Sequence, residues 1–273
     1  MLPDRETSSD VEQTLIIGWT EEKQKILSIL SESITEEMVI LPIYGIGGIG
    51  KTTLAQLVFN DPQFQDYTRV WVYVSQELNL SQIGNSIITQ LTDKIGNIST
   101  KQMLHKRLKE LFFGLGLGRK VVIVTTRDGG LARKICSPAV TPYKLETLTV
   151  DKCWTIIKQK ADFEDRVDQE QLEHIGREIA TKCGGVALAA QSLGHMLNGM
   201  TADEWESVRD SYFWSLSTSE GHEVLGSLLL SYSHMSVSLK LCFSYCAIFP
   251  KGHIMMKYDL IYQWIALGFI EQS

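Results

Sequence analysis

The chain has 273 residues, of which 44% are hydrophobic and 21% are charged, and its net charge is −6. This length allows two domains or three small ones, and the composition is ordinary for a folded protein. The acidic balance argues against nucleic-acid binding, because such binding would need a local basic patch and the sequence contains none.

The first ten residues, MLPDRETSSD, are polar and charged, so they predict no secretory signal. No apolar run approaches the ~20 residues that are needed to span a bilayer. The five cysteines are scattered and lack CxxC spacing, which favours buried free thiols in a reducing compartment over disulfides or a zinc site. We therefore expect a cytoplasmic protein without a membrane span.

The first part of the chain alternates between two kinds of pattern. Taken in order, the sequence predicts a helix over 21–31, a strand over 38–44, a helix over 52–59, a strand over 69–75, helices over 81–95 and 101–113, a strand over 120–126 and a short helix over 128–136. Strands that alternate with helices predict a parallel, doubly wound sheet. Pro42 is unusual in the first strand, because proline cannot donate to a sheet ladder.

Helical patterns dominate after Pro142. They cover 150–161, 168–183, 186–198, 203–212, 222–234, 238–247 and 258–268. The helix over 168–183 should end at Gly184 and Gly185, since glycine readily takes the left-handed conformation that stops a helix. An α/β half is therefore expected to precede an all-helical half.

Residues 45–52 read GIGGIGKT and match the pattern G-x-x-x-x-G-K-[ST] in full. The match lies between an apolar strand and a helix, which is the geometry that phosphate binding requires. The glycines allow the backbone N–H groups to surround a phosphate, and the start of the helix adds its positive end. Lys51 is expected to reach the β- and γ-phosphates, the Thr52 hydroxyl to ligate Mg²⁺, and Thr53 to hold the α-phosphate side.

Several motifs in a fixed order resemble those of one family, the NB-ARC module of plant nucleotide-binding, leucine-rich-repeat immune receptors. The resemblance extends from about Ile16 to Ile270. The motifs that carry it are IIGWTEEK (16–23), FNDPQFQDYTRVWVYVSQ (59–76), VVIVTTRD (121–128), YKLETLTVDKCWTIIKQKA (143–161), CGGVALAAQSLG (183–194) and LKLCFSYCAIFPKGHIMMKYDLIYQWIALGFI (239–270).

The resemblance implies a fold with three parts. A P-loop nucleotide-binding subdomain with a parallel sheet would occupy 1–145, a helical, ARC1-like subdomain 146–200, and a partial winged-helix, ARC2-like subdomain 201–273. Winged helices can bind DNA. Residues 201–273, however, contain four Lys or Arg against eight Asp or Glu, which favours contacts with protein.

The resemblance also implies an adenine-nucleotide site that holds ADP or ATP with Mg²⁺. The backbone at 16–17 would bracket the adenine, Arg127 would sense the γ-phosphate, and Ala187 stands where the family has a proline that caps the base. Trp19 stands where the family usually has arginine. The predicted nucleotide-binding residues are Ile16, Ile17, Gly45, Gly47, Gly48, Ile49, Gly50, Lys51, Thr52, Thr53, Arg127 and Ala187, and Thr52 is the predicted Mg²⁺ ligand.

One feature of P-loop proteins is missing, namely an apolar strand that ends in Asp and anchors Mg²⁺. Between Ser75 and Tyr143, Asp93 falls in an expected helix and Asp128 follows Thr-Thr-Arg. The helices over 81–95 and 101–113 are consecutive, although a parallel sheet needs a strand between them. We hypothesise an internal deletion of one central strand, either in a true variant or because the sequence is incomplete.

Three functions remain open, and no catalytic residue is predicted for any of them. The first is an ADP/ATP switch that gates self-association and defence signalling, with slow or no hydrolysis. The second is an ATPase with true turnover, and the third is a receptor fragment that binds no nucleotide and pairs with other receptors. The expected partners are coiled-coil and leucine-rich-repeat domains of the receptor, or homologous receptor modules.

Overall fold

The structure is a computed structural model, and it describes residues 9–10, 16–33, 37–72, 74, 79–92, 94, 96–114, 120–217, 224–249, 253 and 255–271. The chain forms two compact units. One consists of Glu12–Val58 and Lys120–Met235, and the other of Met1–Val11, Phe59–Arg119 and Ser236–Ser273. The first unit contains the sheet, the glycine-rich loop and most of the helical half.

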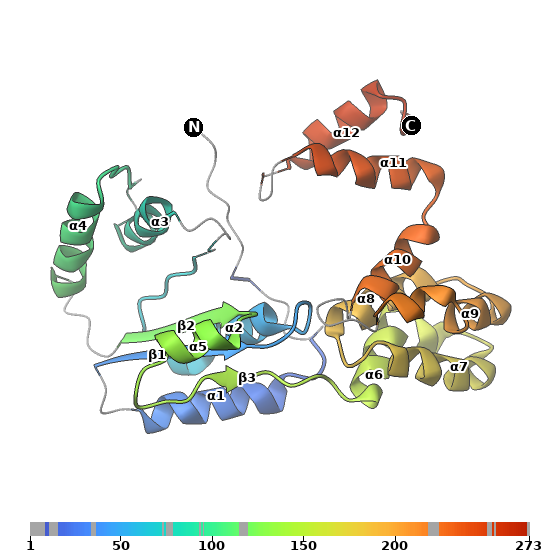
Figure 1. Cartoon of the computed structure of the whole chain (residues 1–273), viewed down its shortest axis with the longest axis horizontal. Helices are drawn as coiled ribbons and strands as arrows, with labels where there is room; N and C mark the ends of the chain where they lie inside the picture. The colour runs from blue at the N-terminus through green and yellow to red at the C-terminus, as the bar shows by residue number, and fades with distance from the viewer. Residues whose placement is uncertain are drawn as a thin grey trace. The chain divides into compact units, whose positions relative to one another are not determined.

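The sheet of the first unit contains β1 (Met38–Tyr44), β2 (Lys120–Thr126) and β3 (Tyr143–Lys144) in the order β2-β1-β3 (Figure 1). Both neighbours are parallel to β1, as predicted. β2 pairs along the whole of β1, whereas β3 pairs only with its last two residues. Val39, Leu41 and Ile43 of β1 are fully buried, so β1 is the centre of the α/β core.

Pro42 is accommodated in β1 because of the edge that it faces. The N–H of Ile40 donates to Ser137 Oγ at 2.8 Å, and the Ile40 carbonyl accepts from the Ser137 N–H at 3.1 Å. N–H groups two residues apart in a strand point to the same edge, so the missing N–H of Pro42 falls on that side. There β3 pairs only from Ile43 onward, and the proline removes no bond to β2.

Three helices pack around the sheet: α1 (Thr20–Glu32), α2 (Lys51–Phe59) and α5 (Gly129–Ile135). Helix α1 runs alongside β3 (Figure 1), and the Tyr143 hydroxyl donates a hydrogen bond to the Glu22 carboxylate. The buried side of α1 carries Ile26, Leu27 and Leu30.

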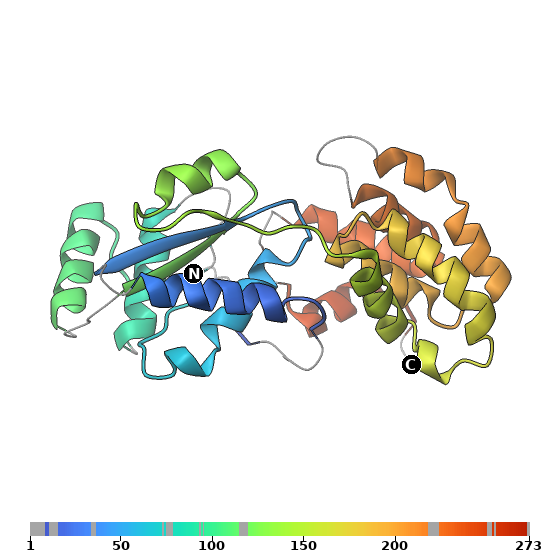
Figure 2. The same cartoon turned by 90° about the horizontal axis from the view of Figure 1, so that it is seen from below.

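The helical half of this unit contains α6 (Val150–Lys160), η3 (Phe163–Asp165), α7 (Gln169–Lys182), α8 (Ala187–Leu197), α9 (Ala202–Arg209), η4 (Tyr212–Ser217) and α10 (Leu225–Ser233). Their colours run from yellow-green to orange in Figure 2. Trp154 and Trp205 are buried at the centre of the helical half, edge to face, with their ring centroids 6.3 Å apart. Helix α7 stops as predicted, with Gly184 at φ +58° and Gly185 at φ +74°.

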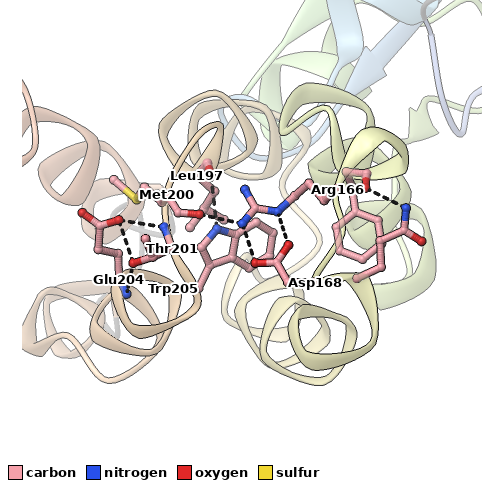
Figure 3. A network of polar contacts seen from close by, with 9 residues as sticks. Arg166, Asp168, Leu197, Met200, Thr201, Glu204 and Trp205 are labelled. Atoms are coloured by element: carbon pink, nitrogen blue, oxygen red, sulfur yellow. Dashed lines mark hydrogen bonds and ion pairs between the residues drawn. The ribbon is translucent and has the colours of Figure 1, made fainter.

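A polar network fastens the start of α7 to the turn between α8 and α9 (Figure 3). The Arg166 guanidinium donates to both carboxylate oxygens of Asp168, at 2.9 and 2.8 Å, and to the Met200 carbonyl at 2.8 Å. Thr201 and Glu204 form a capping box at the start of α9.

The second unit contains η2 (Pro62–Phe64), α3 (Leu80–Thr92), α4 (Lys101–Gly114), α11 (Val237–Tyr245), η5 (Cys246–Ile248) and α12 (Lys257–Ala266). Gly84 of α3 packs against the buried side chain of Leu104 in α4. The Tyr245 hydroxyl donates to Gln263 at 2.9 Å and links α11 to α12.

Two strand predictions need correction. The predicted strand over 69–75 is wrong for the described residues there, 69–72 and 74, which have no strand conformation. A strand needs a neighbour to supply its hydrogen bonds. Here the Gln90 side-chain amide bonds both backbone groups of Trp71 instead, at 2.9 and 2.8 Å. The two-residue strand β3 was not predicted.

The remaining expectations concern disulfide bonds and membrane-spanning helices. All five cysteines are free thiols. Within the described ranges, no helix has the length and apolar character that crossing a bilayer requires.

Candidate phosphate-binding site

The glycine-rich loop connects the end of β1 at Tyr44 to the start of α2 at Lys51. Gly48 has φ +74° and Gly50 has φ +114°, a region of backbone space that strongly favours glycine. Ile49 lies between them with its side chain buried, and the Leu54 N–H donates to the Gly50 carbonyl at 2.9 Å as the first bond of α2. The loop is therefore held at both ends of its glycine turn.

Lys51 folds back over this loop. Its Nζ donates to the carbonyls of Gly45 at 3.0 Å and Ile46 at 2.7 Å. Burial lowers the pKa of Lys51 below its ordinary value, and the nearby positive charge of Arg127 lowers it further. An anion in the loop would oppose both effects, because it favours the charged lysine.

Arg127 reaches the same loop from the neighbouring strand. Thr126 lies opposite Tyr44 in the parallel register of β1 and β2, so the residues that follow both strands emerge at one edge. A Cβ atom built on Gly47 would lie only 3.2 Å from Cζ of Arg127. A side chain at position 47 would therefore displace the guanidinium.

Asp128, the acidic residue nearest to Arg127 in the sequence, caps the start of helix α5. Its carboxylate accepts from the N–H groups of Gly130 at 2.7 Å and Leu131 at 3.1 Å at the start of α5. These two bonds lower the pKa of Asp128. Elsewhere in the described ranges, no group of three or more His, Cys, Asp or Glu is placed to hold a metal ion.

The start of α8 packs directly on the loop. The Leu188 N–H donates to the Gly48 carbonyl at 3.0 Å. A Cβ atom on Gly48 would come within 2.9 Å of Leu188 Cβ and 3.3 Å of Val186 Cγ1. Ala187, the predicted base-side residue, is buried in this junction, although no sequence pattern marked Leu188 or Val186 as neighbours of the loop.

The segment before α1 approaches the loop through Trp19. A Cβ atom built on Gly50 would lie 2.8 to 2.9 Å from Nε1, Cε2 and Cζ2 of the Trp19 indole. Ile16 and Ile17 are half-buried just before it, and among the described residues neither forms a hydrogen bond with the loop.

The structure thus brings together most of the predicted site. The glycines, Lys51 and Arg127 converge, and the helix that begins at Ala187 is bonded to the loop. Thr52 and Thr53 lie in the first turn of α2, with Thr52 exposed. This arrangement fits a phosphate group, because two cations reach one small glycine turn.

Comparisons with known proteins identify the family of the chain. Residues 19–120 match the family described as the NB-ARC domain, and relatives that align with 97% of the chain are plant disease-resistance proteins. The chain belongs to the NB-ARC family.

Three relatives illustrate how similar this NB-ARC chain is to known proteins. It is 35% identical over 299 residues to the putative disease resistance protein RGA1 of Solanum bulbocastanum and 34% identical over 301 residues to disease resistance protein RGA2 of the same plant. It is 30% identical over 302 residues to the putative disease resistance RPP13-like protein 1 of Arabidopsis thaliana. These alignments cover 97 to 98% of the chain but only 28 to 30% of each relative.

The lengths of the alignments bear on the missing strand. Each of the three runs over at least 299 residues, whereas the NB-ARC chain has 273. The relatives therefore have residues that this chain lacks, as the hypothesised internal deletion requires.

Among solved structures, the RuvB Holliday junction branch migration motor of Thermotoga maritima is 18% identical to the NB-ARC chain. The match covers 93% of this chain and 83% of that one, with a TM-score of 0.42.

Proposed function

We propose that this NB-ARC chain is the ADP/ATP-binding switch module of a plant innate-immune receptor, with slow or no ATP hydrolysis. One observation carries the proposal: Lys51 at the start of α2 and Arg127 just after β2 both reach one glycine loop. Neither cation forms an ion pair with a carboxylate among the described residues. A diphosphate or triphosphate is the ligand whose charge and size match such a turn.

The roles proposed for the residues are those that the P-loop motif and the family resemblance imply. The loop N–H groups and Lys51 would hold the β-phosphate, Arg127 would face the γ-phosphate, and Thr53 would lie on the α-phosphate side. Ile16, Ile17 and Ala187 would line the adenine side. Mg²⁺, when bound, would screen the phosphate charge, and the exposed hydroxyl of Thr52 at the start of α2 is its predicted ligand.

We expect slow hydrolysis because of where the acidic side chains lie. Rapid hydrolysis requires a side chain that orients or activates the attacking water, commonly beside a carboxylate that anchors Mg²⁺. Asp128 is engaged at the start of α5, and within the described ranges no other carboxylate pairs with Lys51 or Arg127. The site therefore supports holding a nucleotide better than consuming it.

A bound nucleotide could bias the helical half through the loop. The hydrogen bond between Leu188 and Gly48 joins the loop to α8 at 3.0 Å, so a change in the loop reaches that helix directly. Occupancy by ADP or ATP can shift such a pair of states only by the difference in binding free energy between them.

The proposal places the module within a larger receptor. Its partners would be coiled-coil and leucine-rich-repeat domains or homologous receptor modules, with no nucleic acid, and its location the cytoplasm. The parts proposed for it keep the boundaries 1–145, 146–200 and 201–273.

The test is nucleotide binding by the purified full chain. We expect ADP or ATP to copurify and to be released on denaturation, and calorimetry to show ADP binding. Lys51→Ala should weaken that binding at least tenfold, because a charge-assisted bond is worth about 1.5–3 kcal/mol. Lys25→Ala is the matched control, since Lys25 is an exposed lysine on α1 that is paired with Glu22.

Two outcomes would contradict the proposal. Steady ATP turnover that Lys51→Ala abolishes would favour a true ATPase. A folded sample without ADP binding would favour a receptor fragment that acts only by pairing with other receptors.

A further inference from the structure

The Trp19 indole has a hydrogen-bond donor that no described residue accepts. The residue is only 4% exposed, yet its Nε1–H makes no hydrogen bond within the described part of the chain. The other tryptophans of the same unit are all satisfied: Trp154 donates to Glu173 at 2.9 Å, Trp205 to the Leu197 carbonyl at 3.2 Å and Trp214 to the Val208 carbonyl at 2.8 Å. The Trp19 Nε1–H, which the described part of the chain leaves unpaired, is therefore available to an acceptor on a ligand.

The unpaired donor lies against the phosphate loop. Nε1 is 2.8 Å from the position that a Cβ atom of Gly50 would occupy. Gly50 directly precedes Lys51 and the start of α2, in the part of the loop whose N–H groups face a bound phosphate. The nearest acceptor that a ligand would bring there is a phosphate oxygen.

The backbone on both sides of the Trp19 indole is held by contacts within the chain. Gly18 has φ +102° and packs against Leu148 and Lys152, and Lys152 Nζ donates to the Gly18 carbonyl at 3.3 Å. On the other side, the Lys23 N–H donates to the Trp19 carbonyl at 2.8 Å in the first turn of α1. A donor held in this way binds without the cost of ordering a side chain.

The charge of the site favours a neutral donor at this position. Burial and the proximity of Arg127 already lower the pKa of Lys51, so the two cations disfavour each other beside the loop. The indole N–H adds a hydrogen bond to phosphate without adding a third positive charge.

We propose that the Trp19 Nε1–H donates a hydrogen bond to a phosphate oxygen of the bound nucleoside diphosphate or triphosphate, which makes Trp19 a binding residue of the phosphate site. This inference rests on the proposed function and deepens it.

Calorimetry with ADP compares the native chain with two variants. Trp19→Phe keeps an aromatic ring without a donor, and benzothienylalanine at position 19 keeps the bicyclic shape with sulfur in place of N–H. Both should bind ADP about tenfold more weakly, as expected when a hydrogen bond to a charged group is lost. Trp214→Phe, whose indole is bonded within the helical half, should bind like the native chain.

The indole N–H also gives a direct signal in ¹H–¹⁵N NMR spectra. The Trp19 Nε1–H peak, assigned by its absence from the Trp19→Phe spectrum, should move downfield when ADP is added and stay in place with adenosine. The thermal midpoint of each variant establishes that it is folded, and the benzothienylalanine variant carries the test if Trp19→Phe does not fold.

Each alternative result overturns a stated part of this inference. Unchanged ADP affinity in both variants excludes the hydrogen bond, and a loss in Trp19→Phe alone shows that only packing matters. Movement of the peak with adenosine assigns the contact to the base or ribose and not to phosphate. A native chain that binds no ADP overturns the proposed function itself, and this inference with it.

Discussion

At the level of single residues, a comparison of Gly48 with Gly199 distinguishes the cost of a left-handed backbone from the cost of a steric clash. Their φ angles are +74° and +77°, but a Cβ atom on Gly48 would lie 2.9 Å from Leu188 Cβ, whereas one on Gly199 meets nothing within 4 Å. Alanine at either position should cost about 1–2 kcal/mol for the left-handed conformation. Gly48→Ala should cost roughly 1–3 kcal/mol more, because α8 must move away from the loop. Chemical denaturation measures both losses.

The same pair of variants tests whether the junction between the loop and α8 matters for binding. Gly48→Ala should also weaken ADP binding, because the added methyl group would push α8 away and disturb the Leu188 hydrogen bond to the Gly48 carbonyl, while Gly199→Ala should leave binding unchanged. Equal losses of stability in the two variants would show that the loop and α8 are not tightly packed in solution.

At the level of elements, the Arg166 network is predicted to stabilise the junction of α7, α8 and α9. The Arg166 side chain is 17% exposed and bonds both Asp168 and the Met200 carbonyl. Arg166→Ala should lower the free energy of unfolding by about 2 kcal/mol, since it removes partly buried, charge-assisted bonds.

Arg177→Ala is the matched control for this prediction. Arg177 also bonds two carboxylates, those of Asp151 and Glu173 at 2.8 and 2.7 Å, but its side chain is 48% exposed. Exposed ion pairs contribute only about 0–1 kcal/mol. If urea denaturation gave the same loss for both variants, burial of the Arg166 network would not be the source of its contribution.

Elements that carry their own pattern were predictable from the sequence. The helices α6, α7 and α8 begin and end within about two residues of the predicted limits, because apolar periodicity and the Gly184-Gly185 stop are local signals. Strand β3 is only two residues long and leaves no period to detect. The segment over 69–75 has strand composition, but pairing depends on a neighbour elsewhere in the chain, which composition does not report.

The site shows the same contrast between local sequence patterns and contacts with distant segments. The loop and Lys51 could be predicted because one contiguous motif contains them. The approach of Arg127 to Gly47 was expected only from the family resemblance, and the contacts of Leu188 with Gly48 and Trp19 with Gly50 join segments far apart in the sequence. Such contacts depend on how the helical half packs against the sheet, and no local pattern encodes them.

At the level of the whole molecule, the sheet has an incompletely covered strand at its edge. β2 reads KVVIVTT, a sequence typical of a fully buried strand, yet none of its seven residues is buried. Among the described residues its one paired neighbour is β1. The relatives contain residues that this chain lacks, and a peptide map of the natural product would show whether extra residues lie between Phe113 and Arg119.

An apolar edge strand promotes pairing between molecules, and a charge on that strand opposes it. Val122 in β2 is 40% exposed and Leu131 in α5 is 44% exposed. Light scattering should therefore show concentration-dependent association of the native chain, less association for Val122→Lys, and little change for Leu131→Lys, which adds the same charge away from the strand. Both variants should unfold within about 0.5 kcal/mol of the native chain, because each replaces an exposed side chain. A native chain that stays monomeric at every concentration, or an equal effect of the two lysines, would show that the edge of β2 is covered in solution.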